Sequence, residues 1–233
     1  MRPSSISGSR VGHPPGGRAT RHRARKGEGE LLRDEILDAA EQLLAERGSV
    51  DAVSMRAVAA RVGVTAPALY LHFADKDELF FSCCSRRFEE MAERLRAAAA
   101  GPGTIPERLR SIGEAYVRFG LERAEQYQVL FLGAPPHDLT EAEVAELPGM
   151  RALGLVAELV AEGIASGVLR PELDPVATAV SLWAAVHGIV LIILDKREHD
   201  ILPLPDERVI IEHVLDIALR GLTAQPSAGQ VTR

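Results

Sequence analysis

The chain of 233 residues has little cysteine and little aromatic residue: two cysteines, and 4% Phe, Trp and Tyr together. The cysteines, Cys83 and Cys84, are neighbours, and neighbouring residues on a helix do not link distant parts of a chain. We therefore expect no disulfide framework and a place in the reducing cytoplasm. A content of 46% hydrophobic and 26% charged residues is enough to bury a sizeable core in one or two domains.

Catalytic signatures are also missing from the sequence. It contains no GxSxG nucleophile turn, no P-loop and no GxGxxG after a strand, and no His, Cys and Asp spacing typical of metal ligands. We therefore expect no enzyme, no cofactor and no metal site. Oxidant sensing by Cys83 and Cys84 stays a minor alternative, because Arg86 and Arg87 lie close by in the sequence and cations lower a thiol pKa.

Charge is unevenly distributed along the chain. The net charge is −6, yet residues 1–27 hold seven Arg or Lys and no acid, leaving 20 basic and 33 acidic residues in the remainder. This basic arm, rich in Gly, Pro, Ser and Arg, is expected to be disordered. Two interpretations stay open: a solvated leader, or an arm that contacts nucleic acid or an anionic membrane.

The hydrophobic pattern has a helical period wherever it is regular, and no segment keeps a two-residue alternation between turn residues. We predict an all-α fold with a DNA-binding domain at 28–79, an effector-binding and dimerisation domain at 80–222 and a disordered tail at 223–233. Beyond residue 99 the predicted helices lie near 105–124, 125–132, 140–147, 150–167, 174–196 and 206–222, separated by Pro and Gly.

Residues 176–194 contain no Asp, Glu, Lys or Arg and approach the length of a membrane span. Ser181, Trp183 and His187 interrupt this run, and no positive cluster stands beside it, so a helix buried in a bundle or between subunits is preferred and no membrane partner is expected. The last helix places one apolar stripe beside it. The predicted dimer interface is this stripe, made of Ile210, Val214, Ile217 and Gly221.

Residues 54–79 show two short helices joined by a turn that contains Gly63, the pattern of a helix-turn-helix. Leu69 and Phe73 would anchor the second helix, whose front end would enter a DNA major groove. That helix holds no Arg or Lys, so phosphate contacts must come from around it. The predicted DNA-binding residues are Ser54, Arg56, Thr65, Ala66, Pro67, Ala68, Tyr70, His72 and Lys76. From spacing alone, an ordinary helical hairpin remains an alternative.

The residues of this segment resemble the DNA-binding signature of the TetR family of transcriptional regulators, without a gap from about Leu32 to Leu79. The resemblance rests on Ser54-Met55-Arg56, Val58-Ala59, Val62-Gly63-Val64-Thr65, Leu69-Tyr70, His72-Phe73, Lys76 and Leu79. It implies an all-helical subunit of about nine helices and a homodimer, usually a repressor released from its operator by a small effector. Leu71 departs from the pattern, because many members place a polar or basic residue there.

The rest of the chain resembles the family less strongly. Ala115 to Phe119, Tyr127 to Phe131, and Trp183 with His187-Gly188 resemble a regulatory-domain class named for its Trp and His-Gly residues. The predicted ligand-binding residues are Tyr116, Phe119, Tyr127, Phe131, Met150, Trp183 and His187. Their alternative role is that of plain core, which aromatic residues at helical spacing often have.

These patterns together predict a cytoplasmic, homodimeric regulator that binds a palindromic operator in double-stranded DNA. We expect a repressor that a small-molecule effector of unknown identity releases from that operator. The alternative is a helical interaction module that does not bind DNA and that could lie at the surface of a membrane. Salt-dependent DNA binding separates the two, because a protein that contacts phosphates loses affinity steeply as salt rises.

Overall fold

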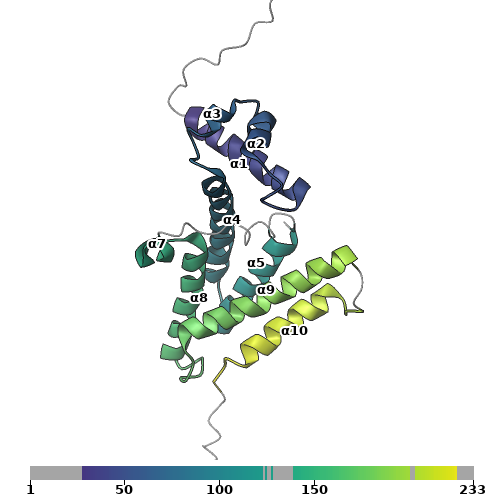
Figure 1. The fold of residues 1–233 in the computed structure, drawn as a ribbon. Helices are drawn as coiled ribbons and strands as arrows, with labels where there is room; N and C mark the ends of the chain where they lie inside the picture. Colours follow the sequence, from purple (N-terminus) through teal and green to yellow (C-terminus); the bar gives the residue numbers. More distant parts are fainter. Residues whose placement is uncertain (1–27, 123, 125–126, 128–138, 200–202, 225–233) are drawn as a thin grey trace, which may run out of the picture.

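The computed structural model describes residues 28–122, 124, 127, 139–199 and 203–224. Within these residues the fold is all-α, as predicted, with nine helices (Figure 1). They are α1 (Glu28–Arg47), α2 (Met55–Val62), α3 (Ala66–Leu69), α4 (Lys76–Ala99), α5 (Ile105–Glu122), α7 (Glu141–Ala145), α8 (Pro148–Ala165), α9 (Pro175–His199) and α10 (Glu207–Arg220).

The N-terminal unit is formed by α1, α2, α3 and the first turns of α4 around their own apolar core. α1 contributes a stripe with the spacing of one helix face, and α3 contributes Leu69, which is 0% exposed. Cys83 and Cys84 of α4 belong to this core as well. The N-terminal core therefore extends past the predicted boundary at residue 79, because α4 continues unbroken through it.

Caps formed by neighbouring residues place the short helices. The Ser54 hydroxyl accepts a hydrogen bond from the Ala57 amide at 3.2 Å at the start of α2, and Gly63 ends that helix with φ +81°, a conformation that favours glycine. Asp75 accepts from the Glu78 amide at 2.8 Å where α4 begins. Thr65 stands at the N-cap of α3, but its side chain makes no capping bond. Pro67 occupies the first turn of α3, where its missing N–H is tolerated.

The C-terminal unit is a bundle of α4, α5, α8, α9 and α10 (Figure 1). α9 and α10 pack side by side along one face of it. Two glycines of α5 permit close approach: a Cβ on Gly120 would lie 2.6 Å from Val190, and one on Gly113 would lie 2.5 Å from Leu215. The observed helix ends lie within about three residues of the predicted ones. The predicted helix at 125–132 falls largely outside the described residues.

The C-terminal boundary needs a small correction. The amide of Arg170 donates to the carbonyl of Leu222 at 3.0 Å, and the amide of Ala224 donates to that of Val168 at 3.2 Å. Thr223 and Ala224 therefore belong to the folded unit and not to the predicted tail, because this pairing satisfies backbone groups that would otherwise need water.

Candidate DNA-binding surface and ligand cavity

The front end of α3 is exposed, and its rear is anchored in the N-terminal core. Leu69 and Phe73 are 0% and 1% exposed, whereas Thr65 and Pro67 face solvent and Tyr70 is 52% exposed. Ala66 and Ala68 are half-buried, and their small side chains would let a binding partner come close to the backbone of α3. This arrangement leaves the N-terminal end of α3 free to meet a groove.

Further candidate contacts lie around α3. Ser54 and Arg56 are exposed at the start of α2, and His72 is half-buried just after α3. Lys76 begins α4, and its Nζ lies 3.3 Å from the Val50 carbonyl oxygen and 3.7 Å from Asp51 Oδ1. The Lys76 ammonium is thus held against the loop between α1 and α2, from which it would have to swing to meet a phosphate.

A buried carboxylate joins α1 to α4. Glu41 of α1 is 5% exposed. Its Oε1 accepts from Arg86 Nη2 at 2.7 Å, and its Oε2 accepts from Arg87 Nε at 2.9 Å. Asp38 also bonds Arg86, and Glu90 also bonds Arg87. No local sequence pattern predicts this ion-pair cluster, because charges 45 residues apart share no periodicity.

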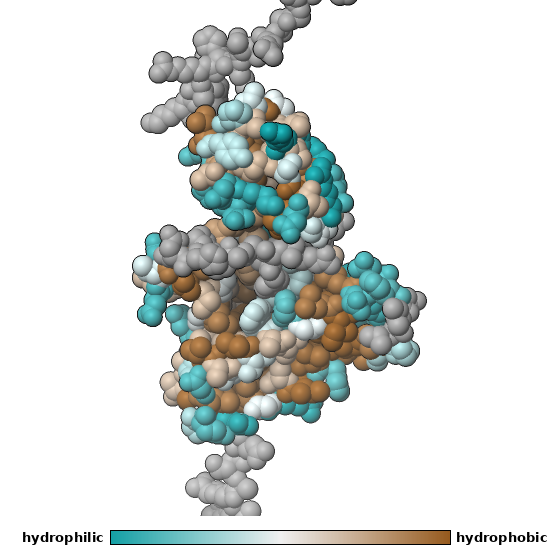
Figure 2. All heavy atoms as spheres, viewed as in Figure 1, coloured by the Kyte–Doolittle hydropathy of each residue, from teal (hydrophilic) through white to brown (hydrophobic). Residues whose placement is uncertain are grey.

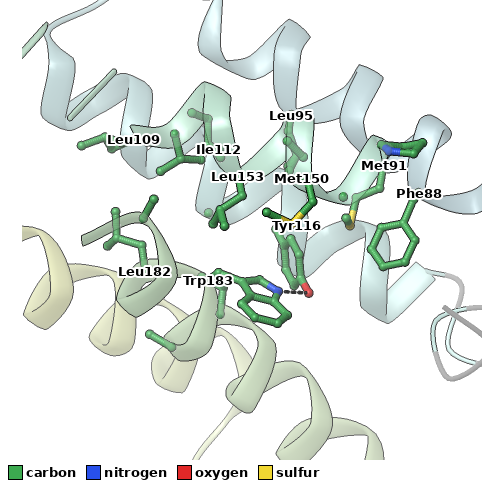
Figure 3. A pocket seen from close by; sticks show the side chains of 18 of the residues that line it. Phe88, Met91, Leu95, Leu109, Ile112, Tyr116, Met150, Leu153, Leu182 and Trp183 are labelled. Atoms are coloured by element: carbon green, nitrogen blue, oxygen red, sulfur yellow. Dashed lines mark hydrogen bonds between the residues drawn. The ribbon is translucent and has the colours of Figure 1, made fainter. Parts of the chain in front are cut away.

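A cavity of about 350 Å³ lies between α4, α5, α8, α9 and α10 (Figure 3). On α4, the side chains that line it recur at helical spacing: Phe81, Cys84, Ser85, Phe88, Met91 and Leu95. None of these α4 residues is among the predicted ligand-binding residues, although their helical spacing is a signal present in the sequence. Cys84 also belongs to the core of the N-terminal unit, so this one residue borders both that core and the cavity.

The predicted ligand-binding residues that the structure describes divide into three groups. Tyr116, Met150 and Trp183 line the cavity. Phe119 does not: it is 0% exposed in the core, with Arg94 over its ring at 5.2 Å. His187 and Tyr127 stand behind Tyr116 and outside the lining. Phe131 lies outside the described residues.

Tyr116 connects the cavity wall to a polar cluster behind it. Trp183 Nε1 donates to the Tyr116 hydroxyl at 3.0 Å (Figure 3). That hydroxyl lies 3.0 Å from the Tyr127 hydroxyl, which lies 2.6 Å from His187 Nδ1. Burial raises the pKa of Tyr116 and Tyr127 and lowers the pKa of His187. The cluster is therefore uncharged at neutral pH.

Cys83 is poorly placed for oxidant sensing. Cys83 is fully buried, and burial raises the pKa of its thiol well above the usual range. The arginines that could have stabilised a thiolate are bound to Glu41. Since the thiolate is the reactive form, this environment disfavours oxidation.

One side of α9 leaves apolar side chains in solvent, and apolar side chains gather over α9 and α10 in Figure 2. Among the described helices, α9 is long and apolar enough to cross a membrane by length and composition, a test that the core helix of a soluble protein also passes. The exposed large apolar residues of these helices are Val176, Val180, Trp183, Leu191 and Ile192 of α9, and Val209 and Ile217 of α10. Contiguous apolar surface of this kind marks interaction sites.

Of the predicted interface residues, Ile217 and Gly221 are exposed in the single chain. Ile210 and Val214 are half-buried against the core. The predicted stripe thus lies partly on the apolar surface and partly beneath it, because α10 packs one of its faces on α5 and α9.

Comparison with known proteins relates this chain to transcriptional regulators. The chain is 30% identical over 118 residues to the transcriptional activator FasR of Mycolicibacterium smegmatis, which covers 51% of this chain and 52% of FasR. It is 40% identical over 77 residues to the transcriptional repressor KstR of the same organism, which covers 33% of this chain and 37% of KstR. The alignments thus span about half or less of these curated relatives.

Solved structures share the fold. A protein of unknown function from Rhodococcus sp. RHA1 superposes with a TM-score of 0.70 at 24% identity, covering 89% of this chain and 100% of that one. Residues 36–83 match the family description "Bacterial regulatory proteins, tetR family", and residues 109–217 match "Tetracyclin repressor-like, C-terminal domain". Since these matches together cover more than half of the chain, it belongs to the TetR family of transcriptional regulators.

Proposed function

We propose that the protein is a homodimeric, cytoplasmic repressor that binds a palindromic operator and leaves it when a small effector fills the cavity. The observation that carries the proposal is the exposed N-terminal end of α3, held rigidly by the fully buried Leu69 and Phe73. Such an end can enter a major groove while α2 crosses the backbone. The repressor assignment follows KstR, the relative named a repressor, to which the chain is 40% identical over 77 residues.

Sequence would be recognised by the front of α3, and orientation would be set by phosphate contacts. Thr65 and Ala68 offer a hydroxyl and methyl groups to base edges. Tyr70, Arg56 and Lys76 surround this end with polar or charged groups that suit phosphates. Ser54, Ala66, Pro67 and His72 complete the proposed surface. The basic arm 1–27 would add affinity for DNA of any sequence.

Dimerisation would use the apolar surface of α9 and α10, including Ile217. Two copies meeting there around a two-fold axis would form a four-helix interface and cover side chains that now face solvent. A dimer can place two recognition helices about 34–36 Å apart, which is the distance between successive major grooves. An effector would shift the population away from that spacing by binding the other arrangement more tightly.

The route from cavity to DNA would run through α4. Its first turns complete the N-terminal core, and its next turns line the cavity. Glu41, Arg86 and Arg87 bind α1 to the same helix, so a shift of α4 carries the DNA-binding unit with it.

The test is fluorescence anisotropy on DNA selected from a random pool, compared with scrambled DNA over a salt series. Lys76→Ala should weaken binding to both DNAs nearly equally. It should also reduce by about one the magnitude of the slope of log affinity against log salt concentration. Changing Thr65 or Ala68 should alter preference at particular base pairs, by about 1–3 kcal/mol for each pair. Arg96→Ala, an exposed cation at the far end of α4, is the matched control. Affinity independent of salt, or no sequence preference in the pool, would contradict the proposal.

A further inference from the structure

The wall of the cavity carries no formal charge. Its lining includes no Asp, Glu, Lys, Arg or His among the described residues, and nearly all of it is aliphatic, aromatic or methionine. Burial of a charged group away from water costs many kcal/mol unless a partner is present, and this wall supplies none. A ligand that enters the cavity must therefore place only uncharged groups there.

The wall has few polar side chains, Cys84, Ser85, Tyr116 and Trp183, and the last two are bonded to each other. Tyr116 accepts from Trp183 and lies within hydrogen-bond distance of Tyr127 and His187. Tyr116 has room to exchange one of these bonds with a neutral oxygen of a ligand, because a hydroxyl donates one bond and accepts others. The imidazole beside Tyr116, His187, has its pKa lowered by burial and supplies no positive charge to a carboxylate at neutral pH.

The shape of the lining is elongated. On α4 it runs from Phe81 to Leu95, which at about 1.5 Å per residue is about 21 Å of helix. In Figure 3, Phe88 and Met91 lie at one end of the cavity, and Leu109 of α5 and Leu182 of α9 lie toward the opposite end. A volume of about 350 Å³ spread over that length suits a slender molecule better than a compact one.

We propose that the ligand of this cavity is an elongated, uncharged, hydrocarbon-rich small molecule, with at most a neutral hydroxyl, carbonyl or ester group placed at Tyr116. The inference rests on the proposed function in taking this ligand to be the effector. An ionised carboxylate or phosphate on the ligand stays outside the cavity, because the wall offers it neither a cation nor a ring of donors.

The protein carries its own probe for this inference. Trp183 is the sole tryptophan of the chain and lines the cavity, so its fluorescence reports occupancy directly. A titration of the full-length protein with 1-hexanol, 1-octanol and 1-decanol should show affinity rising about fourfold per methylene, from the burial of about 0.8 kcal/mol per CH₂. The carboxylic acid of equal length, ionised at pH 8, should bind at least tenfold more weakly than the alcohol.

A matched pair of variants locates the binding. Leu153→Phe narrows the cavity from α8 and should lower the affinity for 1-decanol at least fivefold, whereas Leu155→Phe, on the same helix but outside the lining, should leave it unchanged. Equal or tighter binding of the ionised acid would overturn the inference, and so would an affinity independent of chain length. The wild-type titrations decide the matter even if a variant fails to fold.

Measuring operator DNA affinity in the presence of the same alcohols and acids separates this inference from the proposed function. Binding of 1-decanol that leaves operator DNA affinity unchanged would support the ligand class and contradict the effector role. Release of DNA by the ionised acid alone would support a ligand-released repressor and overturn the ligand class.

Discussion

The ion pairs between α1 and α4 give the sharpest stability prediction. The Glu41 side chain is 5% exposed and pairs with both Arg86 and Arg87. Replacing Glu41 with Ala would therefore leave both guanidinium groups facing a buried site without its carboxylate. Removing one partner of a buried pair costs about 3–5 kcal/mol. The lower end applies here, because the Arg86 and Arg87 side chains are 28% and 14% exposed and keep Asp38 and Glu90 as partners. We therefore expect Glu41→Ala to lower the free energy of unfolding by about 3 kcal/mol.

The assay is urea unfolding followed by far-ultraviolet circular dichroism at one fixed protein concentration. Glu35→Ala, an exposed residue of the same helix, is the control and should change stability by less than about 0.5 kcal/mol. Adding Arg87→Ala to Glu41→Ala should recover part of the loss, because the more buried of the two guanidinium groups then no longer faces the site of the missing carboxylate. A loss in Glu41→Ala no larger than in Glu35→Ala would refute the reasoning.

Three further predictions concern a helix cap, the apolar surface of α10 and His187. Ser54→Ala should cost about 1 kcal/mol in urea unfolding, since it removes the cap of α2, and Thr65→Ala should cost less than half of that because its side chain makes no capping bond. Ile217→Glu should convert the proposed dimer to monomers in light scattering at micromolar concentration, because it places a charge in an apolar interface. Burial lowers the pKa of His187 below 6.5 in the folded protein, so the unfolded chain binds more protons as pH falls and stability decreases with acid. His187→Gln should therefore reduce the drop in Tm between pH 7.5 and 5.5.

Each of these has a result that counts against it. Equal losses in Ser54→Ala and Thr65→Ala would show that the cap is not the source of the effect. A wild-type monomer at micromolar concentration would end the dimer proposal, and Arg208→Glu, exposed on the opposite side of α10, should leave the assembly intact. An acid-induced drop in Tm that His187→Gln leaves unchanged would assign that drop to another group, and the exposed His213→Gln is the matched control.

The helices, their caps and the helix-turn-helix could be predicted from the sequence, because they depend on neighbours in the chain. Ser54 caps α2 through an amide three residues away, and Leu69 and Phe73 stand one turn apart. Bonds and faces of this range repeat with the helical period and can therefore be recognised in one sequence. The helical fold class follows from the same local information.

The cavity and the ion-pair cluster were decided only by the tertiary structure. Trp183 meets Tyr116 across 67 residues, and Glu41 meets Arg87 across 46. Tyr116 and Phe119 are three residues apart on α5 and so lie on nearly the same side of it, yet one lines the cavity and the other packs under Arg94. Sequence periodicity indicates that such side chains point inward, but which helix meets each of them depends on how five helices pack, and that packing is set by contacts between residues far apart in the chain.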